Sequence, residues 1–250
     1  MNSPLSQISV VLVGPKNPGN IGSVVRAMKN NGLSDLRLVT PVDYRDHEDQ
    51  KKMGYRSQEI IAASREYPTL REAVADAGTV MIATAKGGKW KKDFLSPEQA
   101  AAKTMEAAAV QRVALVFGRE DKGVTVDECQ LANYLIRIPM AGPYPSLNLS
   151  QAVMVVTYEV FKASRLGPVT PATQKMADKA AFERLENNWW ALMKDLELSE
   201  PDGGLFHRSL KRALSRTHWT VADIAVFDRA CKQVRWYVHQ YCPVHPQEEP

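Results

Sequence analysis

Three short polar stretches of the sequence carry side chains suited to chemistry on a phosphorylated ligand. The first, Gly14–Met28, reads as a glycine loop between an apolar run and a helix expected over Ile21–Asn31. It contains Asn20 and Gly22 near the start of that helix and Arg26 about one and a half turns into it. The N–H groups at a helix start attract anions, and the planar guanidinium of an arginine pairs with phosphate. This pattern favours a site for a phosphate or a ribose phosphate. The alternative is a tight strand-to-helix turn that needs glycine and binds nothing.

The first stretch does not match the two common nucleotide-binding loops. Gly14 and Gly19 have the spacing of a P-loop, but Asn20-Ile21 stands where Lys-Ser or Lys-Thr is required. A dinucleotide fingerprint needs a further glycine and an acidic residue about 20 positions later. The second expected strand ends Leu38-Val39-Thr40, without that acid. A nucleotide-dependent oxidoreductase is therefore the least compatible function.

The second and third stretches are loops, each expected directly after a strand. Gly118–Gly123 contains Glu120, which could accept hydrogen bonds from loop N–H groups, pair with an arginine, or lie solvated in a turn. Ile138–Ala152 is stiffened by prolines and presents Ser146 and Asn148 where the chain enters a helix. Either residue could simply cap that helix. Ligands bind at the carboxyl ends of parallel strands, which is where both loops fall.

Alternating strands and helices between residues 8 and 166 must position these loops. Capping-box sequences predict helix starts after Thr69, Ser96, Thr125 and Asn148. This alternation predicts an α/β fold with a mostly parallel sheet that is covered on both faces. The apolar runs predict strands at Ile8–Val13, Leu36–Val39, Thr79–Ala83, Val113–Phe117 and Tyr134–Ile138.

A segment with two prolines and a glycine, residues 167–177, predicts a linker between two domains. Residues 1–166 are expected to form the α/β domain. Beyond the linker only helical patterns follow, at about Asp178–Glu197, Gly204–Arg216 and Thr220–Val238. We therefore expect a small all-α domain over residues 178–242 and a tail over residues 243–250.

The composition is that of a soluble globular protein, with 250 residues, 44% hydrophobic and 24% charged. No run approaches the roughly 18 apolar residues of a membrane-spanning helix, and the N-terminus lacks the pattern of a signal peptide. Three cysteines fit reduced thiols in the cytoplasm. The net charge of +4 permits a polyanionic partner without requiring one.

A zinc site is the one metal centre that the sequence raises. Cys231, His239, Cys242 and His245 supply two thiols and two imidazoles, which could bind zinc tetrahedrally. Their spacing fits no standard zinc module, so no metal is expected.

Taken in order, the three stretches resemble the motifs of the SpoU/TrmH class of SPOUT RNA methyltransferases. The matching segments are Asn20–Arg26, Phe117–Gly123 and Ile138–Ala152. The first segment, the Ser-Leu-Asn-Leu helix start and the helical extension most resemble the TrmJ branch. This resemblance implies transfer of a methyl group from S-adenosylmethionine to the ribose 2′-hydroxyl at position 32 of the tRNA anticodon loop. It also implies a homodimer and a deep trefoil knot in the C-terminal part of the α/β domain.

The resemblance also assigns residues to the site. Arg26 is expected to clamp a phosphate rather than act as the base, because a guanidinium is difficult to deprotonate; the general base stays open. The cofactor is expected to contact Thr84, Ala85, Gly118, Ile138, Leu147 and Asn148. The polar catalytic set comprises Asn20, Arg26, Glu120, Ser146 and Asn148.

Two further segments are predicted to contact RNA. Thr84–Lys92 departs from the usual sequence of the branch and contains Lys89 and Trp90, which could pair with phosphate and stack on a base, or lie solvated. Arg208, Arg212 and Arg216 recur every four residues beside Lys211, with no acidic residue between positions 205 and 222. That stripe predicts contact with the RNA backbone, or is a solvated helix face. Trp189, Trp190, Trp219 and Trp236 are expected in the core of the small domain.

Two alternative functions remain open. The same chemistry could act on ribosomal RNA or on another tRNA position. The chain could also be a noncatalytic RNA-binding member of the class, although it retains Asn20, Arg26, Glu120 and Asn148.

Overall fold

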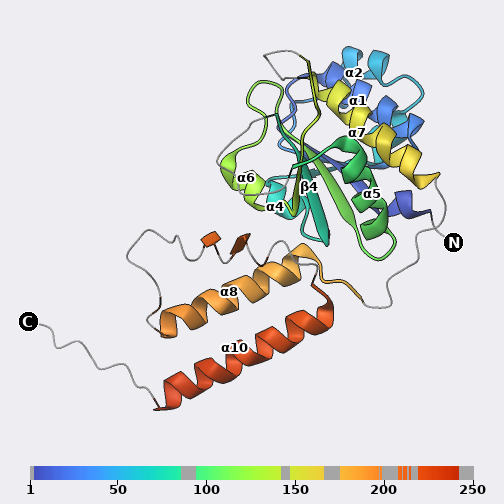
Figure 1. Cartoon of the computed structure of the whole chain (residues 1–250). Helices are drawn as coiled ribbons and strands as arrows, with labels where there is room; N and C mark the ends of the chain where they lie inside the picture. Colours follow the sequence, from blue (N-terminus) through green and yellow to red (C-terminus); the bar gives the residue numbers. More distant parts are fainter. Residues whose placement is uncertain are drawn as a thin grey trace, which may run out of the picture. The chain divides into compact units, whose positions relative to one another are not determined.

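The computed structural model describes residues 3–85, 94–141, 147–165, 175–196, 198, 208–209, 211–212, 214 and 219–241. The chain divides into two compact units, Met1–Thr173 and Gln174–Pro250 (Figure 1).

The first unit is built on one parallel sheet of seven strands, in the order β3-β2-β1-β6-β4-β7-β5. This confirms the predicted α/β fold. The short strands β3 and β5 were not predicted, because two or three residues form no apolar run. β7 ends two residues before the predicted end, and its neighbour β5 has only two residues with which to pair. The strands are β1 (Ile8–Val13), β2 (Asp35–Val39), β3 (Arg65–Tyr67), β4 (Thr79–Ala83), β5 (Phe94–Leu95), β6 (Val113–Phe117) and β7 (Tyr134–Ile136).

Helices cover both faces of this sheet, as Figure 1 shows. α1, α3, α5 and α7 pack on one face, and α4 and α6 on the other. The elements, in chain order, are a 3-10 helix η1 (Pro4–Gln7) and the helices α1 (Pro18–Asn30), α2 (Glu48–Met53), α3 (Gln58–Ala63), α4 (Leu70–Ala73), α5 (Pro97–Ala108), α6 (Val126–Gln130) and α7 (Leu149–Ser164).

Most predicted helix starts are capped as their sequences indicate. Ser96, Thr125 and Asn148 form complete capping boxes before α5, α6 and α7. Thr69 accepts a hydrogen bond from the backbone N–H of Glu72, but no bond returns to the backbone N–H of Thr69. These caps satisfy N–H groups at helix ends that would otherwise lack partners.

The start of α1 differs from the prediction. The helix begins at Pro18 rather than Ile21, because the Asn17 side chain accepts hydrogen bonds from the backbone N–H groups of Gly19 and Asn20. Gly19 and Gly22 therefore lie in the helix, and the interpretation of this segment as a glycine loop is wrong. The turn itself uses Gly14, whose φ of +54° favours glycine.

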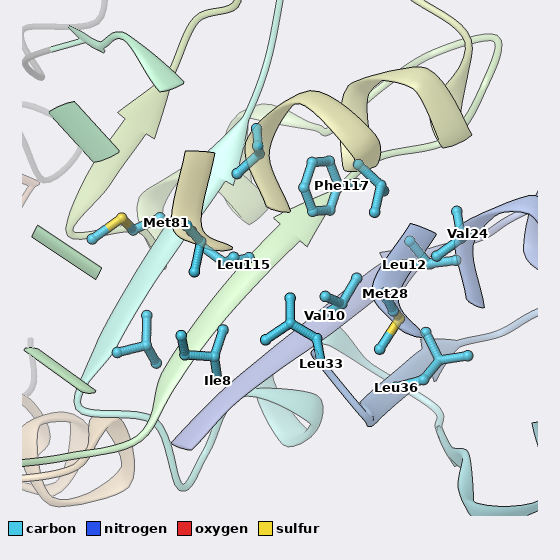
Figure 2. Packing of buried hydrophobic residues seen from close by; sticks show 14 of the residues in the cluster. Ile8, Val10, Leu12, Val24, Met28, Leu33, Leu36, Met81, Leu115 and Phe117 are labelled. Atoms are coloured by element: carbon cyan, nitrogen blue, oxygen red, sulfur yellow. The ribbon is translucent and has the colours of Figure 1, made fainter. Parts of the chain in front are cut away.

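The core consists of two apolar layers, one on each face of the sheet. All six residues of β1 are buried, as expected for a central parallel strand. Val10 and Leu12 belong to the layer beneath α1 and α7, whereas Val11 and Val13 belong to the layer beneath α4 and α6. Figure 2 shows the first layer, where Val10 and Leu12 lie among residues of α1 and β6. This alternation fixes the register of β1.

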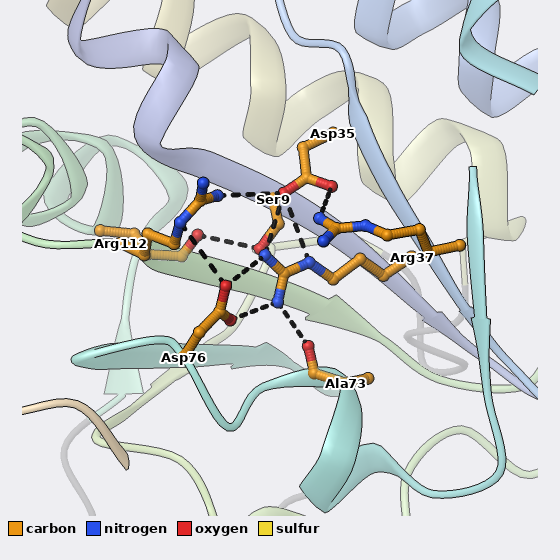
Figure 3. A network of polar contacts seen from close by, with 8 residues as sticks. Ser9, Asp35, Arg37, Ala73, Asp76 and Arg112 are labelled. Atoms are coloured by element: carbon orange, nitrogen blue, oxygen red, sulfur yellow. Dashed lines mark hydrogen bonds and ion pairs between the residues drawn. The ribbon is translucent and has the colours of Figure 1, made fainter. Parts of the chain in front are cut away.

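A buried ionic network closes the amino-terminal edge of the sheet (Figure 3). The side chain of Arg37, which is 1% exposed, donates hydrogen bonds to the Ala73 carbonyl and to the carboxylates of Asp76 and Asp35. Burial disfavours the charged guanidinium, but these bonds outweigh burial and raise the pKa of Arg37. Arg112 approaches both carboxylates at 3.5 Å. The network lies opposite the carboxyl ends of the strands and is therefore structural.

Replacing Arg37 with methionine is expected to lower the free energy of unfolding by about 3 kcal/mol, because two carboxylates and a carbonyl lose their buried partner. Urea denaturation at pH 7 measures this change. Arg65→Met is the matched control, since Arg65 pairs with the same Asp35 at 2.7 Å but is half exposed. The control should cost less than about 1 kcal/mol. Equal effects of the two substitutions would contradict a special role of the buried arginine.

The same network predicts how stability depends on pH. Burial raises the pKa of Asp76, but the hydrogen bond from Arg37 outweighs burial and lowers that pKa overall. The stabilisation by Asp76 is therefore complete above the unfolded pKa of about 3.9 and is lost as the pH falls through the lower folded pKa. Unfolding measured between pH 5 and pH 2 should show this loss in the wild type. The loss should be smaller in Asp76→Asn.

The second unit contains two long helices, α8 (Lys179–Asp195) and α10 (Val221–Tyr241), which pack against each other. Met176 and Thr220 form an isolated antiparallel bridge beside them. Of the predicted helix Gly204–Arg216, the residues that the structure describes are helical, and the others lie outside its described range.

The tryptophans of the second unit do not all lie in its core. Trp189 and Trp190 pack against the buried side chains of Leu192, Met193 and Cys231, and Trp219 contacts the rings of Phe182 and Phe227. Trp236, in contrast, is 55% exposed. Its expected place in the core is wrong, because it lies on a face of α10 that does not contact α8.

Candidate active site

A cavity of about 390 Å³ opens at the carboxyl ends of β4, β6 and β7. Five residues predicted to contact a cofactor line it, namely Thr84, Ala85, Gly118, Ile138 and Leu147. Asn148, the sixth, is not among the lining residues and caps α7 instead. The apolar side chains of Ile136, Ile138, Leu147 and Leu149 face a polar loop across this cavity, so it suits a ligand with both a flat apolar ring and polar groups.

The polar wall of the cavity is the tight loop between β6 and α6. Arg119 and Gly123 exchange two backbone hydrogen bonds of 3.1 and 2.8 Å, which fold the loop back on itself. Gly118 has no room for a side chain, since a Cβ atom there would lie 2.3 Å from the Gly123 carbonyl carbon and 2.5 Å from the Val124 nitrogen. Gly123 has a φ of +62°. Both glycines are therefore required by geometry.

Arg119 anchors this loop, a role that was not predicted from the sequence. Its guanidinium donates to both carboxylate oxygens of Glu128 at 2.9 and 3.1 Å, and its side chain lies beside Gly14. Burial raises the pKa of Glu128, but the hydrogen bonds from Arg119 outweigh it and lower that pKa overall. The only sequence signal for this role was the position of Arg119 between Gly118 and Glu120. Its partner, Glu128, had been assigned only to the cap of the following helix.

Side chains from all three predicted motifs meet next to the cavity. The Glu120 carboxylate accepts hydrogen bonds from the backbone N–H groups of Lys16 at 3.0 Å and Asn17 at 3.3 Å, and from Asn20 Nδ2 at 3.0 Å. Asn148 Nδ2 in turn donates to Asn20 Oδ1 at 3.0 Å. Of the three alternatives for Glu120, the acceptance of loop N–H groups is the one observed. Asn20, Glu120 and Asn148 thus form one network that ties α1 and α7 to the loop after β6.

The two remaining predicted catalytic residues are Ser146 and Arg26. Ser146 lies outside the described residues. Arg26 is exposed, and no residue in the described ranges forms a hydrogen bond or ion pair with it. Arg26 follows Asn20 by six residues, which turns its side chain by about 240° around the helix axis. It also lies more than two turns beyond the start of α1, rather than the predicted one and a half.

The predicted RNA-binding residues are only partly described. Lys89, Trp90 and Arg216 lie outside the described residues, and Arg208 is exposed. Lys211 forms an ion pair of 2.8 Å with Glu186 of α8, and its side chain is 21% exposed. The basic stripe therefore does have a counter-charge, which comes from another helix. This pairing leaves Lys211 less available to a phosphate than its sequence indicated.

The described residues offer neither a metal cluster nor a membrane-spanning segment. Within those ranges, no three His, Cys, Asp or Glu side chains gather as metal ligands would. Cys231 is buried against α8, His239 pairs with Asp195 at 3.0 Å, and Cys242 and His245 lie outside the ranges. None of the described helices has the length and apolar character needed to cross a bilayer.

Known proteins are similar to this chain over lengths that range from about three fifths to nine tenths of it. The model of the SpoU rRNA Methylase family matches residues 7–158. The tRNA (cytidine/uridine/adenosine-2′-O-)-methyltransferase TrmJ of Pseudomonas aeruginosa (strain UCBPP-PA14) is 41% identical over 157 residues, which cover 62% of this chain and 61% of that protein. The Uncharacterized tRNA/rRNA methyltransferase LasT of Escherichia coli (strain K12) is 34% identical over 197 residues, 78% of this chain and 84% of that protein. The crystal structure of TrmJ from Z. mobilis ZM4 has a TM-score of 0.77 at 29% identity, over 90% of this chain and 98% of that one.

Proposed function

The chain belongs to the SpoU rRNA methylase family, and from this premise we propose that it transfers a methyl group from S-adenosylmethionine to a ribose 2′-hydroxyl of tRNA. The observation that carries the proposal is the polar network of Asn20, Glu120 and Asn148 beside the cavity at the carboxyl ends of the strands. The target is the ribose at position 32 of the anticodon loop. Ribosomal RNA is the second candidate, because the name of the Escherichia coli relative includes both RNAs.

The cavity fits S-adenosylmethionine. Ile138, Leu147 and Leu149 would provide an apolar surface for the adenine ring, and the bare backbone at Gly118 would let polar groups of the ligand approach closely. When bound, this cofactor supplies an electrophilic methyl group. Residues of the chain must orient a ribose hydroxyl toward the cavity and help it lose its proton.

Glu120 serves this reaction mainly by positioning. Its carboxylate accepts the N–H groups of the loop before α1 and the side-chain amide of Asn20. Removing that carboxylate would release both Asn20 and the start of α1. Asn20 and Asn148 keep their amides at the edge of the cavity, where they can hydrogen-bond to a ribose. We leave the identity of the base open.

Arg26 acts from the partner subunit of a homodimer. Its side chain leaves α1 about 120° away from Asn20, so it faces away from the network of its own subunit. Met154 and Tyr158 of α7 are exposed, and α7 packs on α1. An exposed apolar strip beside an arginine suits a contact with a second copy, which would carry Arg26 to the opposite cavity. There the guanidinium clamps a phosphate next to the target ribose.

Two features of the class complete the proposal. The segment after β6 forms the trefoil knot, and the helical unit after residue 173 binds the tRNA. Arg208 and Arg212 contribute a salt-dependent part of that affinity, whereas Lys211 contributes less because Glu186 neutralises it.

Methylation of unmodified RNA tests the function directly. The purified protein is incubated with labelled S-adenosylmethionine and either unmodified total tRNA or rRNA, and alkali-resistant linkages are then mapped. Label at one anticodon-loop ribose of tRNA is the expected result. Label in rRNA alone would show that the substrate is rRNA rather than tRNA. RNA binding without label would indicate a noncatalytic member of the family.

A further inference from the structure

Helix α10 exposes an unusual amount of apolar and aromatic surface for a helix in a small unit. Its packing against α8 buries Cys231 and Val238. Along the rest of its circumference, large side chains remain exposed to solvent, and three of them are aromatic residues at its C-terminal end, with exposures of 55%, 56% and 61%. Exposed aromatic clusters of this kind mark binding surfaces. The three residues are Trp236, Tyr237 and Tyr241.

These three rings form a connected cluster. The ring centroids of Trp236 and Tyr241 lie 6.2 Å apart at an interplanar angle of 81°, and those of Tyr237 and Tyr241 lie 4.9 Å apart. Aromatic pairs at such distances stabilise one another by about 0.5–1.5 kcal/mol. The indole of Trp236 is therefore held in place while more than half of it faces solvent. A positioned aromatic side chain loses little entropy when a second ring stacks on it.

The residues around Trp236 on the helix are basic or amide side chains. Arg229, Lys232, Gln233 and Gln240 lie seven, four and three positions before it and four positions after it, which places all four on its side of the helix. All four are exposed. Lys232 pairs with Asp228 at 2.7 Å but remains 71% exposed. From Arg229 to Tyr241 the sequence contains no acidic residue.

We propose that Trp236 is a stacking platform for an unpaired base of the RNA substrate, with Arg229 and Lys232 contacting the adjoining phosphates. Sites for single-stranded nucleic acid combine these parts, an aromatic face for a base and cations along the backbone. Tryptophan and tyrosine are also enriched in protein interfaces, so self-association is the alternative that the experiment must exclude; the depletion of lysine from such interfaces favours RNA. The inference rests on the proposed function and adds a second RNA-binding surface beside the predicted stripe at Arg208 and Arg212.

Substitution of Trp236 in the full-length protein tests the platform. Trp236→Leu keeps apolar volume but removes the aromatic face, and Trp236→Phe keeps a smaller face. We expect Trp236→Leu to weaken binding of an unmodified tRNA transcript and of single-stranded oligo(U) by about 5- to 100-fold, and Trp236→Phe by much less. Oligo(U) should also quench the tryptophan fluorescence of the wild type more strongly than that of Trp236→Phe. Val226→Ala, at an exposed position of the same helix, is the control and should bind like the wild type.

The outcomes separate this inference from the proposed function. If the wild type binds neither RNA and transfers no methyl group, both proposals fail. If the wild type binds and methylates tRNA but Trp236→Leu binds both RNAs equally well, the platform alone is wrong. Sedimentation then shows whether Trp236→Leu has changed the oligomeric state, which would assign this face to self-association instead. S-adenosylmethionine affinity and helix content should not change in any variant.

Discussion

Replacing Arg26 with alanine is expected to lower the rate of methyl transfer by about 100-fold, because the phosphate clamp positions the target ribose and a misplacement of about 1 Å costs about that much. S-adenosylmethionine affinity should stay within a few-fold of the wild type, because Arg26 does not line the cavity. Single-turnover rates on tRNA and calorimetric titration with the cofactor measure the two quantities. Arg26→Lys should recover only part of the rate, since an ammonium group lacks the planar donor fork of a guanidinium.

Lys29→Ala is the matched control for this experiment. Lys29 lies on the same helix, one turn after Arg26, and pairs with the exposed Glu59 at 2.5 Å. Its removal deletes a positive charge of α1 and costs less than about 1 kcal/mol of stability. If Lys29→Ala slows transfer as much as Arg26→Ala does, the effect is one of net charge. If Arg26→Ala keeps the wild-type rate, the assignment of Arg26 is wrong.

The role of the glycines in the first motif could not be predicted from the sequence. Asn17-Pro18 is a helix-start signal that was present in the sequence, yet the glycine pattern favoured a loop. The reason for Gly22 is tertiary, since a Cβ atom there would lie 2.4 Å from the Gln50 carbonyl oxygen of α2. No local pattern predicts that contact, because it depends on where a helix 28 residues away packs. Gly22 thus serves close helix packing rather than ligand binding.

Local patterns and long-range contacts were not equally predictable. β1, β4 and β6 were predicted to the residue because each is a buried apolar run, and the capping boxes were read from four adjacent positions. The grouping of Glu120, Asn20 and Asn148 was implied by the resemblance to the motifs of the family, and hydrogen bonds now connect the three side chains. The pair of Lys211 and Glu186 did not, because two helices must pack before the charges meet. The exposure of Trp236 likewise depends on which face of α10 packs against α8.

Replacing Gly118 with alanine is expected to weaken S-adenosylmethionine binding by about 10- to 100-fold. The added Cβ atom would meet backbone atoms of Gly123 and Val124 at 2.3–2.7 Å, which cannot move aside as a flexible side chain does. The loop from Gly118 to Val124 must open instead, at a cost of about 1–3 kcal/mol. This loop forms one wall of the cavity. Opening the loop would therefore change the shape of the cavity and weaken cofactor binding. Calorimetric titration with the cofactor measures it.

Gly32→Ala separates this effect from a general loss of stability. Gly32 has a φ of +73° in the turn between α1 and β2, so alanine there is strained, but it lies outside the cavity. It should lower the free energy of unfolding by about 1 kcal/mol and leave S-adenosylmethionine affinity unchanged. Equal affinity losses in both variants would mean that the Gly118 effect reports stability rather than the shape of the loop.

The two main variants together test whether Arg26 acts across the proposed dimer. In a mixed dimer, one subunit carries Arg26→Ala and an intact cavity, and the other carries Gly118→Ala and an intact Arg26. If the arginine acts on the partner's cavity, this dimer contains one complete site. At a cofactor concentration near the wild-type Kd, it should then recover about half of the wild-type activity, although each parent dimer is nearly inactive. If Arg26 acts within its own subunit, the mixed dimer has no complete site and stays as inactive as its parents.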